Sequence, residues 1–216
     1  MLEWILEALA EAGFQKKDVV FVSGYREDVL KARYPELTYV TNKNWKNNNI
    51  LSSLFAAREH MGEGFLCSYT DIIYRGKTIK ELVEAPHNIV LGNDTDWRRR
   101  YRDRSQHPET DGEKMRVEDD LVVEVSRHIA PKDADGEFIG VAKLSSDGAR
   151  QLGDAFDRER ARKNGALGDK AYLIELFQRM IESGAELRRV DTHGGYMELD
   201  TLEDLANAEK WWRESR

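Results

Sequence analysis

The sequence of 216 residues has little of what marks disulfide-bonded, zinc-binding or membrane-spanning proteins. It contains one cysteine, Cys67, which excludes an internal disulfide and a zinc site built from several cysteines. No apolar run approaches the length of a membrane span. Only four residues are proline and 40% are hydrophobic, a composition that excludes a disordered chain. We therefore expect a globular, cytoplasmic protein of one domain, residues 1–216, with no membrane partner.

The charge is moderately acidic. Forty Asp and Glu residues outnumber 33 Lys and Arg residues, which gives a formal net charge of −7. A surface of this sign argues against broad nucleic-acid binding, although a local basic site could still hold an anionic small molecule. We therefore expect no nucleic-acid partner.

Helical and strand patterns alternate along most of the chain. Short β-branched runs such as "DVVFVSG" and "GFLCSYTD" are separated by amphipathic stretches such as "LEWILEALAEAGF" and "NNILSSLFAAREHMG". Such alternation is typical of α/β proteins in which helices cover a parallel sheet. The pattern predicts a three-layer sandwich around a mostly parallel, Rossmann-like mixed sheet.

Residues 94–130 have a different character. A charged cluster, "DTDWRRRYRDR", is followed by two short alternating runs that flank Glu118-Asp119-Asp120. Alternation on both sides of an acidic turn is typical of a β-hairpin. We interpret this segment as an insertion or flap that carries a small hairpin.

Two acids stand where strands are predicted to end. Asp71 closes the apolar run "FLCSYTD", and "GYMELDTLEDL" places Glu198 and Asp200 at alternate positions, on one face of a strand. In open α/β sheets, ligands gather at the carboxyl ends of strands, and Mg²⁺ binds one or two carboxylates together with phosphate oxygens. The alternative is structural: Asp71 would turn the chain, and Asp200-Thr201 would begin a helix with Glu203 three residues on.

Several segments together resemble a known family. "YTDIIY", "EFIGVAKLS" and "GYMELDTLEDLANAEKW" are similar to nucleotidyltransferases of the MobA-like NTP transferase fold. "NNNILSSLFAA", "DTDWRRRYRDRSQHPETDGEK" and "GEFIGVAKLSSDGA" resemble the phosphocholine and phosphonate cytidylyltransferase branch. The resemblance covers essentially the whole chain. It implies a transfer of CMP from CTP to phosphocholine, 2-aminoethylphosphonate or a similar acceptor, with release of pyrophosphate. Asp71 and Asp200 would be the catalytic acids that hold Mg²⁺.

Further candidates lie near these motifs. Asn49 and Ser53 are four residues apart on one helical face, near the cytidine or substrate pocket by resemblance; Asn49 could equally be a simple N-cap. Arg98 and Arg102 belong to the densest cationic cluster and could clamp a phosphate or phosphonate, unless the cluster is only a solvated helix face.

Two residues of the stretch "EFIGVAKLS" and one acid near Asp200 complete the set. Glu137 could meet a cationic head group by charge, or be a surface acid without a role. Lys143 could touch phosphate or only extend to solvent. Glu198 could contact the substrate from the strand that leads to Asp200.

The chain departs from the family at its start. Members begin with a strand and a glycine-rich G-x-G-x-R loop, followed by a Pro-Lys pair, and "MLEWILEALAEAG" matches the helix that comes after them. We therefore expect a domain that lacks one strand, with impaired activity and a tendency to form homo-oligomers. A sugar-1-phosphate nucleotidyltransferase and a non-catalytic binding remnant are the alternative functions.

Overall fold

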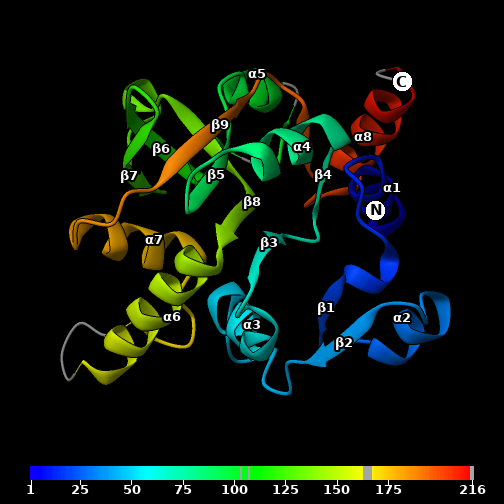
Figure 1. Cartoon of the computed structure of the whole chain (residues 1–216). Coiled ribbons are helices and arrows are strands. Elements are labelled where there is room, and N and C mark those ends of the chain that lie inside the picture. The colour runs from blue at the N-terminus through cyan, green and yellow to red at the C-terminus, as the bar shows by residue number, and fades with distance from the viewer. Residues whose placement is uncertain (103, 107, 163–166, 215–216) are drawn as a thin grey trace.

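The computed structural model describes residues 1–102, 104–106, 108–162 and 167–214, and Figure 1 shows their arrangement. The α-helices are α1 (Leu2–Glu11), α2 (Glu27–Arg33), α3 (Ile50–Ala56), α4 (Gly76–Glu84), α5 (Trp97–Arg102), α6 (Ser146–Ala161), α7 (Leu173–Glu182) and α8 (Leu202–Glu214). The strands are β1 (Val20–Ser23), β2 (Thr38–Thr41), β3 (Gly64–Ser68), β4 (Ile72–Tyr74), β5 (Ile89–Asp94), β6 (Lys114–Glu118), β7 (Leu121–Ser126), β8 (Gly136–Ser145), β9 (Arg188–Thr192) and β10 (Tyr196–Glu198). The predicted alternation of helices and strands is confirmed.

The strands form a six-stranded sheet and two pairs. The large sheet has the order β3-β8-β5-β9-β7-β6, with β6 also touching β8; β1 pairs with β2, and β4 pairs with β10. Within the large sheet, β5 and β9 are the only parallel neighbours among the described residues. The prediction of a mostly parallel, Rossmann-like sheet is therefore wrong. The reason is β8, which lies between β3 and β5 and runs antiparallel to both.

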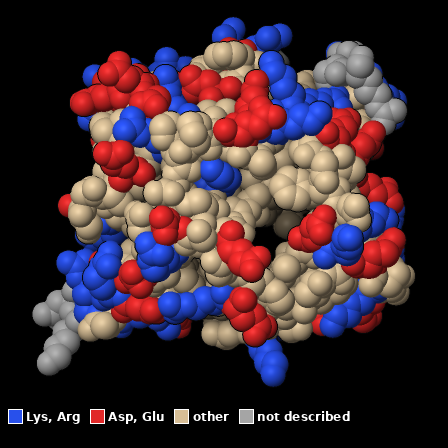
Figure 2. Space-filling model, in the orientation of Figure 1, with Lys and Arg blue, Asp and Glu red and all other residues tan. Residues whose placement is uncertain are grey.

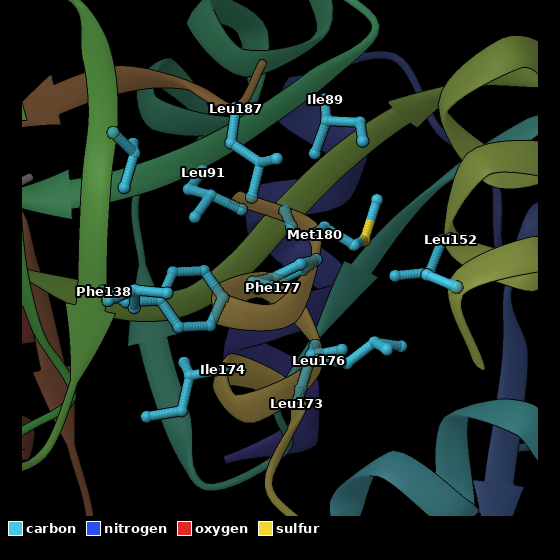
Figure 3. Packing of buried hydrophobic residues seen from close by; sticks show 14 of the residues in the cluster. Ile89, Leu91, Phe138, Leu152, Leu173, Ile174, Leu176, Phe177, Met180 and Leu187 are labelled. Carbon is cyan, nitrogen blue, oxygen red and sulfur yellow. The ribbon is translucent and has the colours of Figure 1, made fainter. Parts of the chain in front are cut away.

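One face of the large sheet packs against α3, α6 and α7. Alternate residues of β5, Ile89 and Leu91, point to this face and join a buried cluster with Phe177 of α7 and Leu152 of α6. Figure 3 shows these side chains between the strands and the helices, with Phe138 of β8 close to Phe177. The two phenyl rings meet edge to face, with centroids 6.0 Å apart. The buried cluster on this face contains more residues than the cluster on the opposite face.

The opposite face packs against α1 and α4. Val90, which lies between Ile89 and Leu91 in sequence, points to this second cluster together with Ile5 of α1 and Ile79 of α4. Figure 1 shows α6 and α7 at the lower left and α1 and α4 at the upper right, with strands between them. The predicted three-layer arrangement is thus present, although the sheet inside it is mixed.

The predicted hairpin is also present. Strands β6 and β7 are antiparallel, and Asp119 at their turn adopts a left-handed conformation with φ of 55°. The hairpin extends the large sheet, because β7 pairs with β9 and β6 with β8. The charged cluster before it forms the short helix α5.

The first and last helices are joined by aromatic rings. Trp4 of α1 stacks on Trp212 of α8, with ring centroids 5.6 Å apart. The guanidinium of Arg75 lies 3.9 Å from the Trp212 ring centroid and donates a hydrogen bond of 2.8 Å to its carbonyl oxygen. Because Arg75 directly follows β4, this contact links α8 to the β4–β10 pair.

The surface carries charges of both signs. Figure 2 shows acidic and basic side chains interspersed over the face seen in Figure 1, with a hollow near its centre. None of the described helices is both long and apolar enough to cross a membrane.

Strands β1 and β3 each have one strand neighbour within the described part of the chain, β2 and β8 respectively. Free strand edges present unpaired backbone N–H and C=O groups that can pair with another chain. We expect the 216-residue chain to self-associate at micromolar concentration, with sedimentation velocity showing dimers or larger species that grow with concentration. A single monomeric species at every concentration would contradict this expectation.

Candidate active site

A pocket of about 420 Å³ opens where the link between β3 and β4 approaches the start of β8 and the loop before α3. Its volume lies in the range of small-molecule sites. Most of its lining comes from residues 45–53, 69–71, 111–113, 137–140 and 196–200. Segments that are far apart in the sequence, between residues 45 and 200, therefore meet here.

Asp71 and Asp200, predicted as a pair from the sequence, both line this pocket. Strand β4 pairs antiparallel with β10, with Ile72 opposite Glu198. One step beyond, the backbone N–H of Leu199 donates a 2.7 Å hydrogen bond to the carbonyl oxygen of Asp71. An antiparallel pair, rather than the carboxyl ends of parallel strands, thus brings the two acids into one pocket.

The electrostatics of these acids favour a cation between them. Burial raises the pKa of the Asp71 carboxyl, and the negative charge of Asp200 raises it further. Burial also raises the pKa of Glu198, again with a contribution from the charge of Asp200. A divalent cation would relieve this repulsion. Asp71 and Glu198 are therefore more easily protonated than usual, because their ionised forms are buried beside another negative charge.

The donor set fits Mg²⁺ as it is held against a nucleotide. The described residues contain no group of three or more His, Cys, Asp and Glu side chains that could hold a metal by themselves. Mg²⁺ usually takes only one or two carboxylates and completes its shell with water and substrate phosphates. Asp71 and Asp200 supply that number, so the remaining ligands would come from the substrate.

Arg104 compensates the acids on this side of the pocket. Its side chain is only 3% exposed, and its guanidinium lies 2.8 Å from Asp204, 2.9 Å from Asp200 and 3.3 Å from Glu198. Burial alone would raise the pKa of Asp204, but the hydrogen bonds from Arg104 and Thr201 outweigh it and hold that pKa below its usual value. One buried cation thus holds three carboxylates in place.

Asp204, one of these three acids, stabilises the start of α8. Asp204 accepts a 2.9 Å hydrogen bond from the backbone N–H of Thr201, and the Thr201 hydroxyl accepts one of 3.1 Å from the N–H of Asp204. The sequence predicted Glu203 for this position; Glu203 instead accepts hydrogen bonds from Ser105. The predicted helix start is present, but its acidic residue is Asp204, one position after Glu203.

Glu137 lines the pocket but is already paired inside the protein. It is 2% exposed, forms an ion pair with Arg100 and accepts a 2.6 Å hydrogen bond from the Tyr101 hydroxyl. The guanidinium of Arg100 also lies 4.3 Å from the ring centroid of Tyr196. The predicted contact of Glu137 with a cationic head group therefore involves a carboxylate whose charge is largely neutralised.

Three other predicted residues do not line the pocket. Arg98 and Arg102 are exposed, and the guanidinium of Arg98 lies 5.3 Å from the centroid of the neighbouring Trp97 ring. The cationic cluster instead turns Arg100 and Arg104 inward, where they bind acids of the protein.

Lys143 also lies outside the pocket's lining. Its ammonium donates 2.8 Å hydrogen bonds to the carbonyl oxygens of Ala85 and His87. The geometry of the pocket thus gives no support to the acceptor-binding roles predicted for this lysine, Arg98 and Arg102.

Asn49 and Ser53 do line the pocket, from the start of α3. Asn49 accepts a hydrogen bond of 2.9 Å from the N–H of Ile50, so it is also the N-cap that the alternative interpretation expected. The buried Asn42 donates hydrogen bonds to Ser53 Oγ and to Asn48 Oδ1, at 3.0 and 2.9 Å. This amide network fixes the loop that precedes α3.

Glu113 is a pocket residue that sequence reasoning missed. It accepts a 3.2 Å hydrogen bond from the Tyr69 hydroxyl, and burial raises its pKa to about 8. The surrounding "TDGEKM" is typical of a polar turn, so only the tertiary structure reveals that this acid points inward.

Arg127 was also missed. It lines the pocket, pairs with Asp111 at 3.2 Å and places its guanidinium 5.1 Å from the ring centroid of Tyr172. The segment after β7 that carries it showed no motif in the sequence. Its charge gives one wall of the pocket a cation.

Known proteins resemble this chain in sequence and in fold. No family model matches the sequence. Over 95% of its length the chain is 23% identical to the CTP:phosphoglutamine cytidylyltransferase of Campylobacter jejuni, and the match covers 85% of that protein.

Solved structures are similar over nearly the whole chain. The inositol-1-phosphate CTP transferase from T. maritima matches with a TM-score of 0.74 and 17% identity, over 99% of this chain and 81% of that one. The CTP:phosphocholine cytidylyltransferase from Streptococcus pneumoniae matches with a TM-score of 0.67 and 15% identity, over 98% and 84%. The predicted resemblance to nucleotidyltransferases, including cytidylyltransferases, is confirmed, and the likenesses support the prediction of an enzyme of this class.

Replacement of Arg104 by methionine tests the charge balance of the acidic wall. Because Asp204, Asp200 and Glu198 would lose their shared counter-charge, we expect the free energy of unfolding at pH 7 to fall by about 3–5 kcal/mol. Because the pKa of Asp204 is lower in the folded protein, its ionised carboxylate stabilises the wild type at pH values above its unfolded pKa. This stabilisation is lost as the pH falls through the folded pKa. The deficit of Arg104→Met, measured by chemical denaturation, should therefore shrink at acidic pH.

The matched control for this variant is Arg116→Met, since Arg116 is half exposed and pairs with Glu124 at 3.3 Å. An exposed pair of this kind contributes at most about 1 kcal/mol. Equal losses in both variants, or a deficit of Arg104→Met that does not change with pH, would contradict the assigned role.

Glu113 should make stability depend on pH above the usual carboxyl range. Its pKa of about 8 in the folded protein exceeds its unfolded value, so the folded state keeps the proton and loses stability as pH rises from about 4 to 8. Glu113→Gln cannot ionise, so its Tm should exceed that of the wild type at pH 8 by several degrees, roughly 2–4 °C per kcal/mol. Calorimetry at pH 4, 6 and 8 checks this; a Tm difference that stays constant over the range would refute it.

Proposed function

We propose that this protein transfers CMP from CTP to a phosphorylated or phosphonylated small molecule and releases pyrophosphate. The observation that carries the proposal is the meeting of Asp71 and Asp200 in one pocket on a nucleotidyltransferase fold. The three relatives are named for CTP together with phosphoglutamine, inositol 1-phosphate or phosphocholine. Their common feature is a phosphorylated acceptor, which is the acceptor class proposed for this protein.

The reaction needs no covalent enzyme intermediate. An oxygen of the acceptor's phosphate or phosphonate attacks the α-phosphorus of CTP, and the bond to the oxygen that bridges to the β-phosphate breaks. Pyrophosphate leaves with that electron pair. Cys67 takes no part as a nucleophile, because burial raises the pKa of its thiol to about 12.

The chain's contribution is positioning and charge. Asp71 and Asp200 would hold Mg²⁺, which when bound neutralises negative charge on the α-phosphate and the leaving pyrophosphate. Arg104 keeps Asp200 in a fixed orientation from behind, at 2.9 Å. Asn49 and Ser53 lie on the lining contributed by the start of α3, where the nucleoside would bind.

The charge of the pocket favours an acceptor with an ammonium group. Besides Asp71 and Asp200, which would hold Mg²⁺, the acids Glu113 and Glu198 are in its lining. The one cation among the described lining residues, Arg127, is paired with Asp111. An ammonium near Glu113 would also stabilise the ionised form of this buried carboxyl. Phosphocholine and 2-aminoethylphosphonate carry such a group, whereas a sugar 1-phosphate does not.

Removal of the metal ligand should abolish turnover without unfolding the protein. With CTP, Mg²⁺ and a panel of phosphocholine, 2-aminoethylphosphonate and inositol 1-phosphate, we expect pyrophosphate release that Asp71→Asn lowers at least ~100-fold, because metal stabilisation of the transition state contributes several kcal/mol. Thermal denaturation should show little change, since Asp71→Asn removes an unfavourable buried charge.

The control is Asp154→Asn, an exposed acid on α6, which should leave the rate unchanged. Pyrophosphate release by Asp71→Asn at the wild-type rate would exclude the proposed metal site. No release by the wild type with any triphosphate would favour a non-catalytic binding protein.

A further inference from the structure

A tryptophan stands in the lining of the pocket on a loop that no step of the proposed reaction uses. Trp45 is 39% exposed and lines the pocket. It precedes α3 within "TNKNWKNNN", a loop of amide and basic side chains.

The ring of Trp45 is held in a defined place. A Cβ atom at Gly24 would lie 2.6 Å from the ring, so the absence of a side chain there lets the indole pack against the backbone. The ring of Tyr25 supports it, with centroids 5.5 Å apart. Asn42, which is 6% exposed, ties the loop together through its hydrogen bonds to Asn48. The indole is thus presented to the pocket by a fixed loop.

The charge around Trp45 is opposite to that of the facing acids. The sequence contains no Asp or Glu between Leu37 and Arg58. The ammonium of Lys46 lies 5.4 Å from the indole centroid. The acids of the pocket, such as Asp71 and Glu113, come from other segments. An uncharged, planar group that is joined to an anionic chain fits this part of the pocket, whereas a cationic acceptor group would be repelled by Lys46.

We propose that Trp45 is the surface on which the nucleobase of the triphosphate stacks, an inference that rests on the nucleotidyl transfer proposed above. A base that stacks on the indole takes the place of the Lys46 ammonium, which becomes available to a phosphate oxygen. Asn48 and Asn49 line the same part of the pocket, and their amides are held by hydrogen bonds to Asn42 and to the carbonyl oxygen of Lys170. Stacking on an aromatic side chain does not depend on hydrogen-bond readout, so Trp45 would set the affinity for nucleosides rather than the choice of base.

The test compares CTP with inorganic triphosphate, which has no base, by titration calorimetry in the presence of Mg²⁺. We expect Trp45→Ala to raise the Kd for CTP about tenfold, equivalent to ~1.4 kcal/mol, and to leave the Kd for triphosphate unchanged. Trp45→Phe should keep most of the affinity for CTP, because a phenyl ring still stacks. The quenching of tryptophan fluorescence by CTP should disappear in Trp45→Phe.

Gly24→Ala is the matched variant that moves the ring without removing it, because the new methyl group occupies the position of the indole. It should weaken CTP binding in the wild-type background and have no further effect when combined with Trp45→Ala. Equal weakening of CTP and triphosphate by Trp45→Ala, or no weakening of either, would overturn the inference while the proposed function stands. Failure of the wild type to bind CTP at all would instead overturn the proposed function, and this inference with it.

Discussion

The acidic side of the pocket depends on one buried guanidinium. Arg104 lies within 3.3 Å of carboxylates from three positions, Glu198, Asp200 and Asp204. Without a counter-charge, carboxylates this close together would repel one another. The arginine therefore supplies the positive charge against which Asp200 is oriented. Arg104 also fixes the start of α8, because its partner Asp204 accepts a hydrogen bond from the backbone N–H of Thr201 just before that helix.

The pocket joins two kinds of lining that suit the two ends of a nucleotide. Asp71 and Asp200 provide negative charge, which repels phosphate unless a cation lies between. Residues 45–53 provide amides, hydroxyls and an indole without any acid. A ligand with a triphosphate at one end and an uncharged ring at the other is complementary to this division, provided that a divalent cation accompanies it.

Much of this could be read from the sequence, and the failures have identifiable causes. The acids Asp71 and Asp200 were found because each stands directly beside a predicted strand, a signal that is local. The mostly parallel sheet was wrong because β8 looks the same in sequence whether its neighbours run with it or against it. The sequence did not show which arginines lie near the pocket, because a run of cations does not reveal which of them a short helix turns inward. Glu113 gave no signal, since its burial depends on Tyr69, 44 residues away.

The two strands that carry the acids form a small sheet of their own. Strand β4 pairs only with β10 among the described residues, and neither belongs to the six-stranded sheet. Three residue pairs in register, together with the stacking of Trp4 on Trp212, hold this unit in place. The position of the two acids therefore depends on this short strand pair, whose side chains Ile72, Tyr74 and Tyr196 pack against Val90 of the large sheet. A ligand that binds both acids would therefore stabilise the folded state by holding together a strand pair with only three residue pairs in register.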